Sequence, residues 1–215
     1  LYTIGNQIME VLVLHQDMSR RTARQHAVKM LKEVGIPLPE RRFGEYPHQL
    51  SGGMRQRAMI AMALACQPSL LLCDEPTTAL DVTIQAQVLD LMLDLKREFK
   101  TSIIMITHDL GVIAEIADKV IVMYLGHGVE YAGVKDIFKE PLHPYTQGLI
   151  TSIPSISKPL KQLEPIQGIV PNPINLPEGC SFKSRCPRAM DRCGADSPLL
   201  KEIKPGHLVA CWLYE

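Results

Sequence analysis

Two adjacent carboxylates follow one short apolar run, and a histidine follows another. The run from Leu70 to Cys73 leads into Asp74 and Glu75, and the run from Thr101 to Ile106 is followed closely by His108. If these runs are parallel strands, their polar side chains meet at the edge where open α/β sheets bind ligands. Asp74 suits Mg²⁺ and Glu75 suits a water molecule, whereas a purely structural carboxylate pair would need cationic partners that the nearby sequence lacks. A lone histidine there is more often a helix cap, so a functional role for His108 is indicated only together with the other motifs.

A serine and two glycines precede a stretch rich in Met, Ala and Leu. Ser51 suits the N-cap of a helix that extends to Ala65, and Gly52 and Gly53 follow it directly. Free N–H groups and the helix dipole attract anions at such a terminus, so a phosphate fits there. In isolation, Ser-Gly-Gly more often marks an ordinary turn and cap.

The elements around these residues alternate between strand and helix patterns. Between the two apolar runs, four apolar residues recur at helical spacing: Val88, Leu89, Met92 and Leu95. A helix-like stretch from Leu110 to Ala117 then leads to a third apolar run, from Lys119 to Tyr124. This order predicts an α/β fold with a parallel sheet, buried on both faces and covered by helices.

The chain divides into three predicted regions. Residues 1–49 show the period of an amphipathic helix pair, from Thr3 to Gly35, and form the first part of a helical subdomain. Residues 50–138 form the α/β core. Residues 139–215 form an extension in which prolines gather and apolar residues are too sparse to fold the segment by burial alone. This extension holds four cysteines, at positions Cys180, Cys186, Cys193 and Cys211.

The amino-acid composition argues against nucleic-acid binding and against a membrane-spanning protein. Lys plus Arg equals Asp plus Glu at 23 each, so no net field favours nucleic acid or an anionic bilayer. The longest apolar stretch is broken by Gln67-Pro68, which argues against a membrane span, and no export signal is visible. We therefore expect a cytoplasmic protein that does not bind nucleic acid.

Four motifs together carry a family resemblance. Leu50-Ser-Gly-Gly-Met-Arg-Gln-Arg57, then Leu-Leu-Leu-Cys-Asp-Glu-Pro76, then Thr77-Thr-Ala-Leu-Asp81, then Thr107-His-Asp109 resemble the ATPase subunit of ABC transporters in order and spacing. The resemblance covers about residues 1–138 and implies a partial P-loop NTPase core with a helical subdomain.

The resemblance also implies roles. ATP would face the signature residues Ser51, Gly52, Gly53 and Gln56 and the D-loop residue Asp81. Asp74 would end Walker B and bind Mg²⁺, Glu75 would be the catalytic carboxylate, and His108 would be the switch histidine.

The extension indicates a subfamily. Pro141-Leu-His-Pro-Tyr-Thr-Gln-Gly-Leu149 and Ile153-Pro154 are similar to the extension of oligopeptide and dipeptide importer ATPases, which nickel-type relatives share. In that subfamily, four cysteines placed like Cys180, Cys186, Cys193 and Cys211 can ligate an iron–sulfur cluster. Their C-x5-C-x6-C-x17-C spacing is unlike a zinc finger, so we favour a [4Fe–4S] cluster over zinc and over two disulfides, which suit exported domains.

The sequence departs from the family in one respect. No G-x-x-x-x-G-K-[ST] run occurs in the 215 residues, and the Q-loop glutamine is missing too. Leu1 aligns just after the family's Q-loop, which predicts a chain cut short at its N-terminus rather than a degenerate subunit. By itself the chain is then expected neither to bind nor to hydrolyse ATP.

The resemblance predicts an assembly at the cytoplasmic face of the membrane. A second ATPase subunit would bind head to tail, permease subunits would contact the helical subdomain, and an extracytoplasmic solute-binding protein would act indirectly. The solute (dipeptide, oligopeptide, nickel or another) and the choice of homo- or heterodimer stay open at this stage.

Two other functions compete with an ATP-hydrolysing subunit. The chain could supply only its signature face to a competent partner, with the cysteine tail as a structural or redox element. A DNA-repair or chromosome-organising ATPase has the same motifs, but the absence of coiled-coil heptads and of net charge weakens that alternative.

Overall fold

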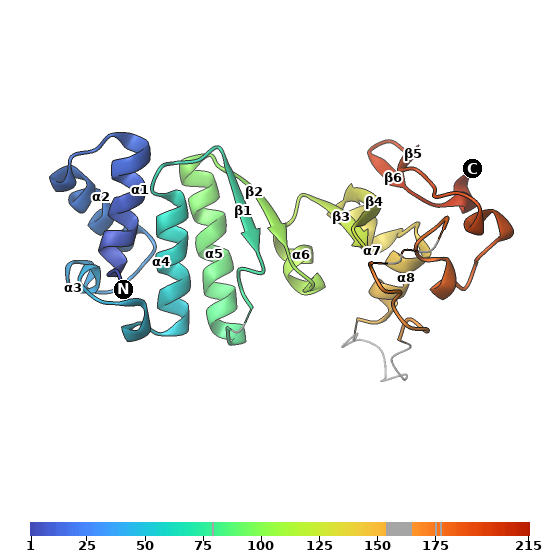
Figure 1. Ribbon diagram of the computed structural model, residues 1–215, viewed down its shortest axis with the longest axis horizontal. Coiled ribbons are helices and arrows are strands. Elements are labelled where there is room, and N and C mark those ends of the chain that lie inside the picture. Colours follow the sequence, from blue (N-terminus) through green and yellow to red (C-terminus); the bar gives the residue numbers. More distant parts are fainter. Residues whose placement is uncertain (79, 154–164, 175, 177) are drawn as a thin grey trace. The chain divides into compact units, whose positions relative to one another are not determined.

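A computed structural model describes residues 1–78, 80–153, 165–174, 176 and 178–215. These residues form two units, Leu1–Asp109 and Leu110–Glu215, which Figure 1 shows in colours that follow the sequence. Ala79 of the Thr-Thr-Ala-Leu-Asp motif and Pro154 of the Ile-Pro pair lie outside the described residues. The three regions predicted above, with boundaries after residues 49 and 138, stay predictions.

The N-terminal part of the first unit is helical, and three of its helices have a hydroxyl side chain as N-cap. The helices are α1 (Ile4–Gln16), α2 (Arg20–Glu33), α3 (Pro39–Phe43), the 3₁₀ turn η1 (Pro47–Gln49) and α4 (Gly52–Leu64). Thr3, Ser19 and Ser51 cap α1, α2 and α4 by accepting a hydrogen bond from a first-turn N–H group. The predicted helix pair over residues 3–35 and the predicted helix after Ser51 are both confirmed.

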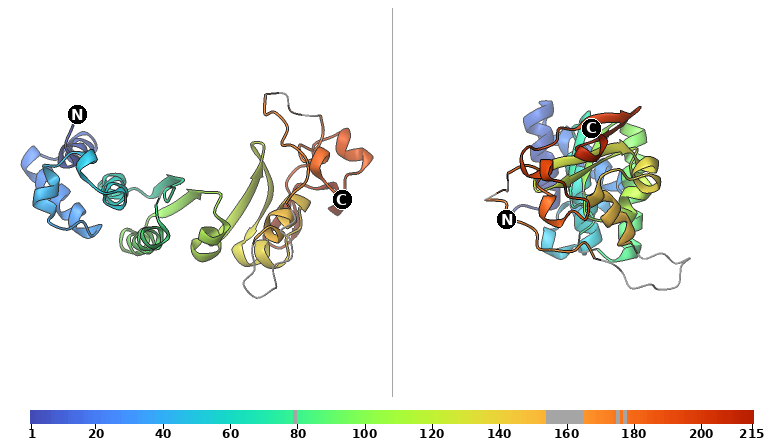
Figure 2. Two further views of the ribbon diagram at one scale, coloured as in Figure 1. Left: turned by 90° about the horizontal axis from the view of Figure 1, so that it is seen from below. Right: turned by 90° about the vertical axis from the view of Figure 1, so that its right-hand side faces the viewer.

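A β-α-β unit completes the first unit. Strands β1 (Leu70–Asp74) and β2 (Ser102–Ile106) pair in parallel, and helix α5 (Val82–Phe99) connects them. The four residues predicted to form the apolar face of α5 are all buried: Val88, Leu89, Met92 and Leu95. Helices α4 and α5 run side by side next to the sheet (Figures 1 and 2). The register places Asp74 opposite Ile106, so both strands end at the same edge.

The two strands are not buried on both faces, and that prediction is wrong. Cys73 and its same-face neighbours pack into the core, whereas the alternate residues Leu70, Leu72, Ile104 and Ile106 are 46–67% exposed. A continuous apolar run reveals strand propensity but not which layers cover the strand.

The second unit contains an antiparallel sheet. Its four strands, in the order β3-β4-β6-β5, are β3 (Lys119–Tyr124), β4 (His127–Gly133), β6 (His207–Val209) and β5 (Lys201–Lys204). Its helices are α6 (Leu110–Ile116), α7 (Val134–Lys139) and α8 (Pro144–Thr151), with 3₁₀ turns η2 (Lys183–Arg185), η3 (Asp191–Gly194) and η4 (Trp212–Tyr214).

Strand β3 does not join the parallel sheet, contrary to the expectation from strand–helix alternation. It pairs with β4 in an antiparallel hairpin. Leu125 and Gly126, which join the two strands, both have positive φ, at 48° and 81°. A two-residue loop of this conformation matches the twist of a hairpin.

Aromatic side chains fill the core of the second unit. Phe182, from the segment after the last undescribed residue, is 1% exposed and packs against Tyr124, Tyr145 and His143 at ring-centroid distances of 5.2, 5.3 and 5.7 Å. The cysteine-bearing tail therefore shares a core with the sheet. Among the described residues, no helix has the length and apolar character needed to cross a bilayer.

Candidate functional site

Glu75 is held by three parts of the first unit at once. It follows β1, and its N–H donates to the Ile106 carbonyl at the end of β2, 2.9 Å away. His108 Nδ1 lies 2.7 Å from Glu75 Oε1, and the Thr78 hydroxyl donates to Oε2 at 2.7 Å. Both oxygens of this carboxylate thus have a defined partner.

The backbone at Glu75 is strained. Its φ is +48°, in the left-handed region that non-glycine residues seldom occupy. Such conformations persist only where surrounding contacts enforce them, and they often occur at functional sites. Here the hydrogen bonds on the backbone and on both carboxylate oxygens provide those contacts.

The Glu75–His108 pair favours its charged form. The hydrogen bond from His108, followed by that from Thr78, lowers the pKa of Glu75 below its ordinary value. The same contact with Glu75 raises the pKa of His108. The side chains of Glu75 and His108 are 37% and 84% exposed, so both stay accessible to water and to a ligand.

The two aspartates predicted for this region have different surroundings. Asp74 ends β1 and is exposed, which leaves its carboxylate accessible to a cation. Asp81 is exposed too, and it caps α5 by accepting a hydrogen bond from Ile84 N–H at 3.0 Å. A structural role as N-cap is therefore sufficient to explain Asp81.

The segment before α4 adopts the predicted helix N-terminus. The Ser51 hydroxyl accepts a hydrogen bond from Met54 N–H at 3.3 Å. A side chain at Gly53 would come within 2.7 Å of the Ile84 side chain, whereas one at Gly52 would meet nothing closer than 3.8 Å. Packing against Ile84 therefore requires a glycine at position 53 but not at position 52. The backbone at Gly52 is open, so a ligand could approach it closely. Gln56 is half-buried one turn further along α4.

The predicted residues form two groups rather than one. Glu75 and His108 are hydrogen-bonded to each other, with Asp74 adjacent in the chain. Ser51 has no hydrogen bond to this pair within the described residues. Packing of Gly53 against Ile84, in the first turn of α5, connects the two groups indirectly.

Thr78 was missed by the sequence analysis. A hydroxyl three residues after a carboxylate, in a turn, was the available signal, because that spacing brings the two side chains together.

The four cysteines of the extension gather in the second unit. All four are free, and the backbones of Cys180 and Cys193 are joined by an N–H···O bond of 2.8 Å. Burial raises the pKa values of the Cys180 and Cys186 thiols, and raises that of Cys211 to about 11. The charges of other cysteines in this group contribute to each rise, after burial. Even so, no three His, Cys, Asp or Glu side chains of the described residues are arranged to hold a metal ion.

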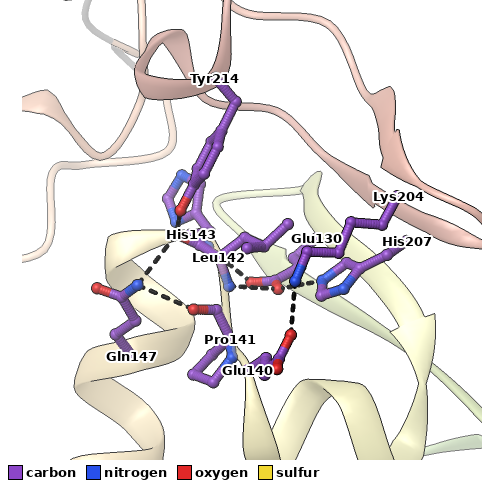
Figure 3. Close-up of polar contacts among 9 residues, drawn as sticks. All are labelled: Glu130, Glu140, Pro141, Leu142, His143, Gln147, Lys204, His207 and Tyr214. Atoms are coloured by element: carbon purple, nitrogen blue, oxygen red, sulfur yellow. Dashed lines mark hydrogen bonds and ion pairs between the residues drawn. The ribbon is translucent and has the colours of Figure 1, made fainter.

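A buried network in the second unit was also missed (Figure 3). Glu130 is 0% exposed and accepts hydrogen bonds from Leu142 N–H at 2.7 Å, His143 N–H at 2.9 Å and His207 Nε2 at 2.7 Å. Tyr214 further donates to the Leu142 carbonyl at 2.8 Å. This network joins β4 and β6 to the Pro-Leu-His-Pro-Tyr segment, and spacing in the sequence gives no signal for it.

Comparisons with known proteins agree with this geometry. The sequence profile of the ABC transporter family matches residues 3–78, and that of the oligopeptide/dipeptide transporter C-terminal region matches residues 129–193. The fold resembles an inward-facing putative metal-chelate ABC transporter, with 24% identity, a TM-score of 0.59, and coverage of 69% of this chain and 57% of that one. It also resembles cbiO1 from Clostridium perfringens, with 27% identity, a TM-score of 0.56, and coverage of 64% and 53%. The chain belongs to the ATP-binding proteins of ABC transporters.

Within that class, the similarity lies with peptide transporters. The chain is 60% identical to the oligopeptide transport ATP-binding protein AppD of Bacillus subtilis, over 99% of this chain and 65% of AppD. It is 52% identical to OppD of Salmonella typhimurium, over 97% and 62%, and 49% identical to the dipeptide protein DppD of Escherichia coli, over 98% and 64%. The chain thus belongs to the oligopeptide/dipeptide type and spans less than two thirds of the length of these relatives, between 62% and 65%.

Proposed function

We propose that this chain is part of an ATP-hydrolysing subunit that powers the import of peptides or a related solute through an ABC transporter. The observation that carries the proposal is Glu75, a carboxylate at the end of β1 with both oxygens oriented by hydrogen bonds. The similarity to oligopeptide and dipeptide transport proteins supports the type of solute.

The chemistry follows from the placement of Glu75. Phosphoryl transfer from ATP depends mostly on positioning and electrostatics, so a carboxylate that orients the attacking water is the central protein group. His108 and Thr78 restrict the directions that Glu75 can adopt, and its partial exposure admits water. Asp74, exposed at the end of β1, would hold Mg²⁺, which when bound neutralises charge on the transferred phosphate.

The N-terminus of α4 would contact the nucleotide of a second subunit. Ser51, Gly52 and Gly53 present first-turn N–H groups, and Gln56 follows one turn later. We propose that a homologous ATPase subunit binds head to tail across this surface, that permease subunits contact the helical part, and that the assembly lies on the cytoplasmic face of the membrane.

A pair of matched variants tests this assignment. Ser51→Asp and Ser19→Asp each replace one capping residue with another, so both helices keep their N-caps. Only the charge at residue 51 would face a triphosphate, where like-charge repulsion lowers ATP hydrolysis by about tenfold or more. The assay uses the whole encoded protein, reconstituted with its permease in vesicles. Equal activity of the two variants would remove Ser51 from the site, and no hydrolysis by the wild type would refute the function.

A second test concerns residues 1–215 alone. These residues include no Walker A run, and dipole and amide contacts at a helix N-terminus contribute at most about 2 kcal/mol. Calorimetric titration with Mg-ATP should therefore show no micromolar binding. Micromolar binding would mean that residues 1–215 contain a phosphate-binding site other than the N-terminus of α4.

We further propose that Cys180, Cys186, Cys193 and Cys211 bind a [4Fe–4S] cluster. Support comes from four free cysteines in one unit, two of which, Cys180 and Cys193, are joined by a backbone hydrogen bond. Ligation would require their side chains to converge beyond the described arrangement. Anaerobically purified protein should be brown and contain iron, and replacement of Cys186 with Ser should abolish both. Stoichiometric zinc without iron would contradict the assignment.

A further inference from the structure

A glutamine outside the recognised motifs joins the loop that carries His108 to helix α5. Gln85 Nε2 donates to Asp109 Oδ2 at 3.1 Å, and the contact is partly buried. Asp109 N–H in turn donates to the Thr107 hydroxyl at 3.1 Å, which closes the loop around His108. The loop is therefore attached to α5 by the residue that directly follows the histidine.

The same turn of α5 comes a few residues after Glu75 in the chain. Gln85 N–H donates to the Asp81 carbonyl at 2.8 Å, and Thr78 N–H donates to the Glu75 carbonyl at 3.2 Å. Between these bonds, the Thr78 hydroxyl reaches the Glu75 carboxylate. The first turn of α5 thus follows the segment that supplies Glu75 in the chain and is hydrogen-bonded to the segment that supplies His108.

Packing does little to fix the orientation of the His108 side chain. The His108 side chain is 84% exposed, and its contact with Glu75 is a single hydrogen bond. An exposed side chain that must keep one orientation loses conformational entropy, which contacts elsewhere in the loop have to offset. A neutral amide suits this task, since it donates to Asp109 without adding charge to the loop that carries His108.

We propose that Gln85 is a positioning residue for ATP hydrolysis, which holds the loop of residues 107–109 so that His108 stays on Glu75. The inference rests on the proposed function, because it assigns Gln85 to the same site. It adds a link between that site and the first turn of helix α5.

Gln87 offers a matched control. It is the same residue type on the same helix, it is exposed, and its Oε1 accepts a hydrogen bond of 3.4 Å from Arg57 rather than from the loop. Four variants form the test: Gln85→Ala removes the donor, Gln85→Glu replaces it with a repelling carboxylate of equal size, Gln85→Lys restores a donor, and Gln87→Ala is the control. Thermal melts verify that each variant folds.

Two measurements separate this proposal from the proposed function. The first is an NMR titration of the His108 ring in residues 1–215, which needs no ATP and is assigned by its loss in His108→Asn. The second is steady-state ATP hydrolysis by the whole encoded protein. We expect Gln85→Ala to lower the pKa of His108 toward its ordinary value. Gln85→Glu and Gln85→Lys carry charges that act on this pKa themselves, so they are compared by kcat alone, which Glu should lower as Ala does and Lys should restore.

In the kinetic assay, we expect Gln85→Ala to reduce kcat by about 3- to 10-fold with little change in KM, which is the loss typical of one orienting hydrogen bond. Gln87→Ala should change neither measurement. If Gln85→Ala and Gln87→Ala behave alike in the titration, the positioning role is overturned. If the wild-type protein lacks ATPase activity while the titration responds as expected, the function fails but the link stands.

Discussion

The two units each contain a Glu–His pair with the same nitrogen–oxygen distance of 2.7 Å, yet the pairs differ widely in their exposure to solvent. Glu75 and His108 in the first unit are 37% and 84% exposed. Glu130 and His207 in the second unit are 0% and 3% exposed. The contact alone therefore says little about what either pair does.

Surroundings decide the role of each pair. Two backbone N–H groups and His207 surround Glu130, so its carboxylate is fully used in holding the chain together. Glu75 sits on a strained backbone at the end of a strand, and its side chain is partly exposed to solvent. A buried pair whose hydrogen-bonding groups are all used suits a structural role, whereas an exposed pair with a fixed orientation suits a catalytic role.

The sharpest test of this contrast removes the charge of Glu75. Glu75→Gln keeps the size of the side chain but cannot act as a base or orient water as a carboxylate does. We expect ATP hydrolysis by the whole encoded protein to fall about 10²–10⁴-fold, with ATP binding preserved. Glu98→Gln, at an exposed position on α5, serves as the control. If Glu75→Gln hydrolyses ATP as fast as the wild type, another residue must act as the base.

The corresponding change in the second unit should affect stability instead. Glu130→Ala leaves His207 and two backbone N–H groups buried without their acceptor, which costs about 3–5 kcal/mol of unfolding free energy. Denaturant titration can follow the second unit by fluorescence, because Trp212 is the single tryptophan of the chain. Glu140→Ala removes only an exposed contact with Lys204 and should cost far less. Equal losses in the two variants would contradict an architectural role for Glu130.

A neighbour of the buried pair predicts a dependence on pH. Burial lowers the pKa of His143 to about 4, whereas an ordinary histidine titrates near 6.5. Above pH 6.5 neither the folded nor the unfolded chain binds this proton. As the pH falls below 6.5, the unfolded chain takes it up first, so stability decreases by up to about 1.4 kcal/mol per pH unit until the pH nears 4.

His143→Asn should reduce this slope. Asparagine can still accept the hydrogen bond from Tyr145 N–H that caps α8, but it does not titrate. Denaturant titrations at several pH values, again followed by Trp212, measure the slope for both proteins. An unchanged slope would show that other groups cause the acid sensitivity.

The exposed pair predicts the smallest effect. The contact with Glu75 raises the pKa of His108, so any stabilisation is complete below the ordinary histidine value and is lost as pH rises through the raised one. Because the pKa of Glu75 is lowered, the same stabilisation is also lost as pH falls through that lowered value. In Glu75→Gln, the NMR titration of His108 should move toward the ordinary value. No movement would mean that the pair does not form in solution.

Local pattern was enough to predict much of the first unit. Residues at helical spacing identified α1, α2 and α5, and a Met-, Ala- and Leu-rich run after the capping residue Ser51 identified α4. The order of the motifs indicated the ABC transporter family, and the comparisons confirm that family. These features are determined by sequence because each depends on residues within a few positions of one another.

Only the tertiary structure decided the pairings between distant segments. Strand β3 turned back onto β4 instead of extending the parallel sheet, and one face of β1 and β2 stayed exposed. Glu130 meets His207 across 77 positions of the chain, and Gln85 meets Asp109 across 24. No local period encodes such contacts, since they depend on where the folded chain returns and on which groups burial leaves in need of a partner.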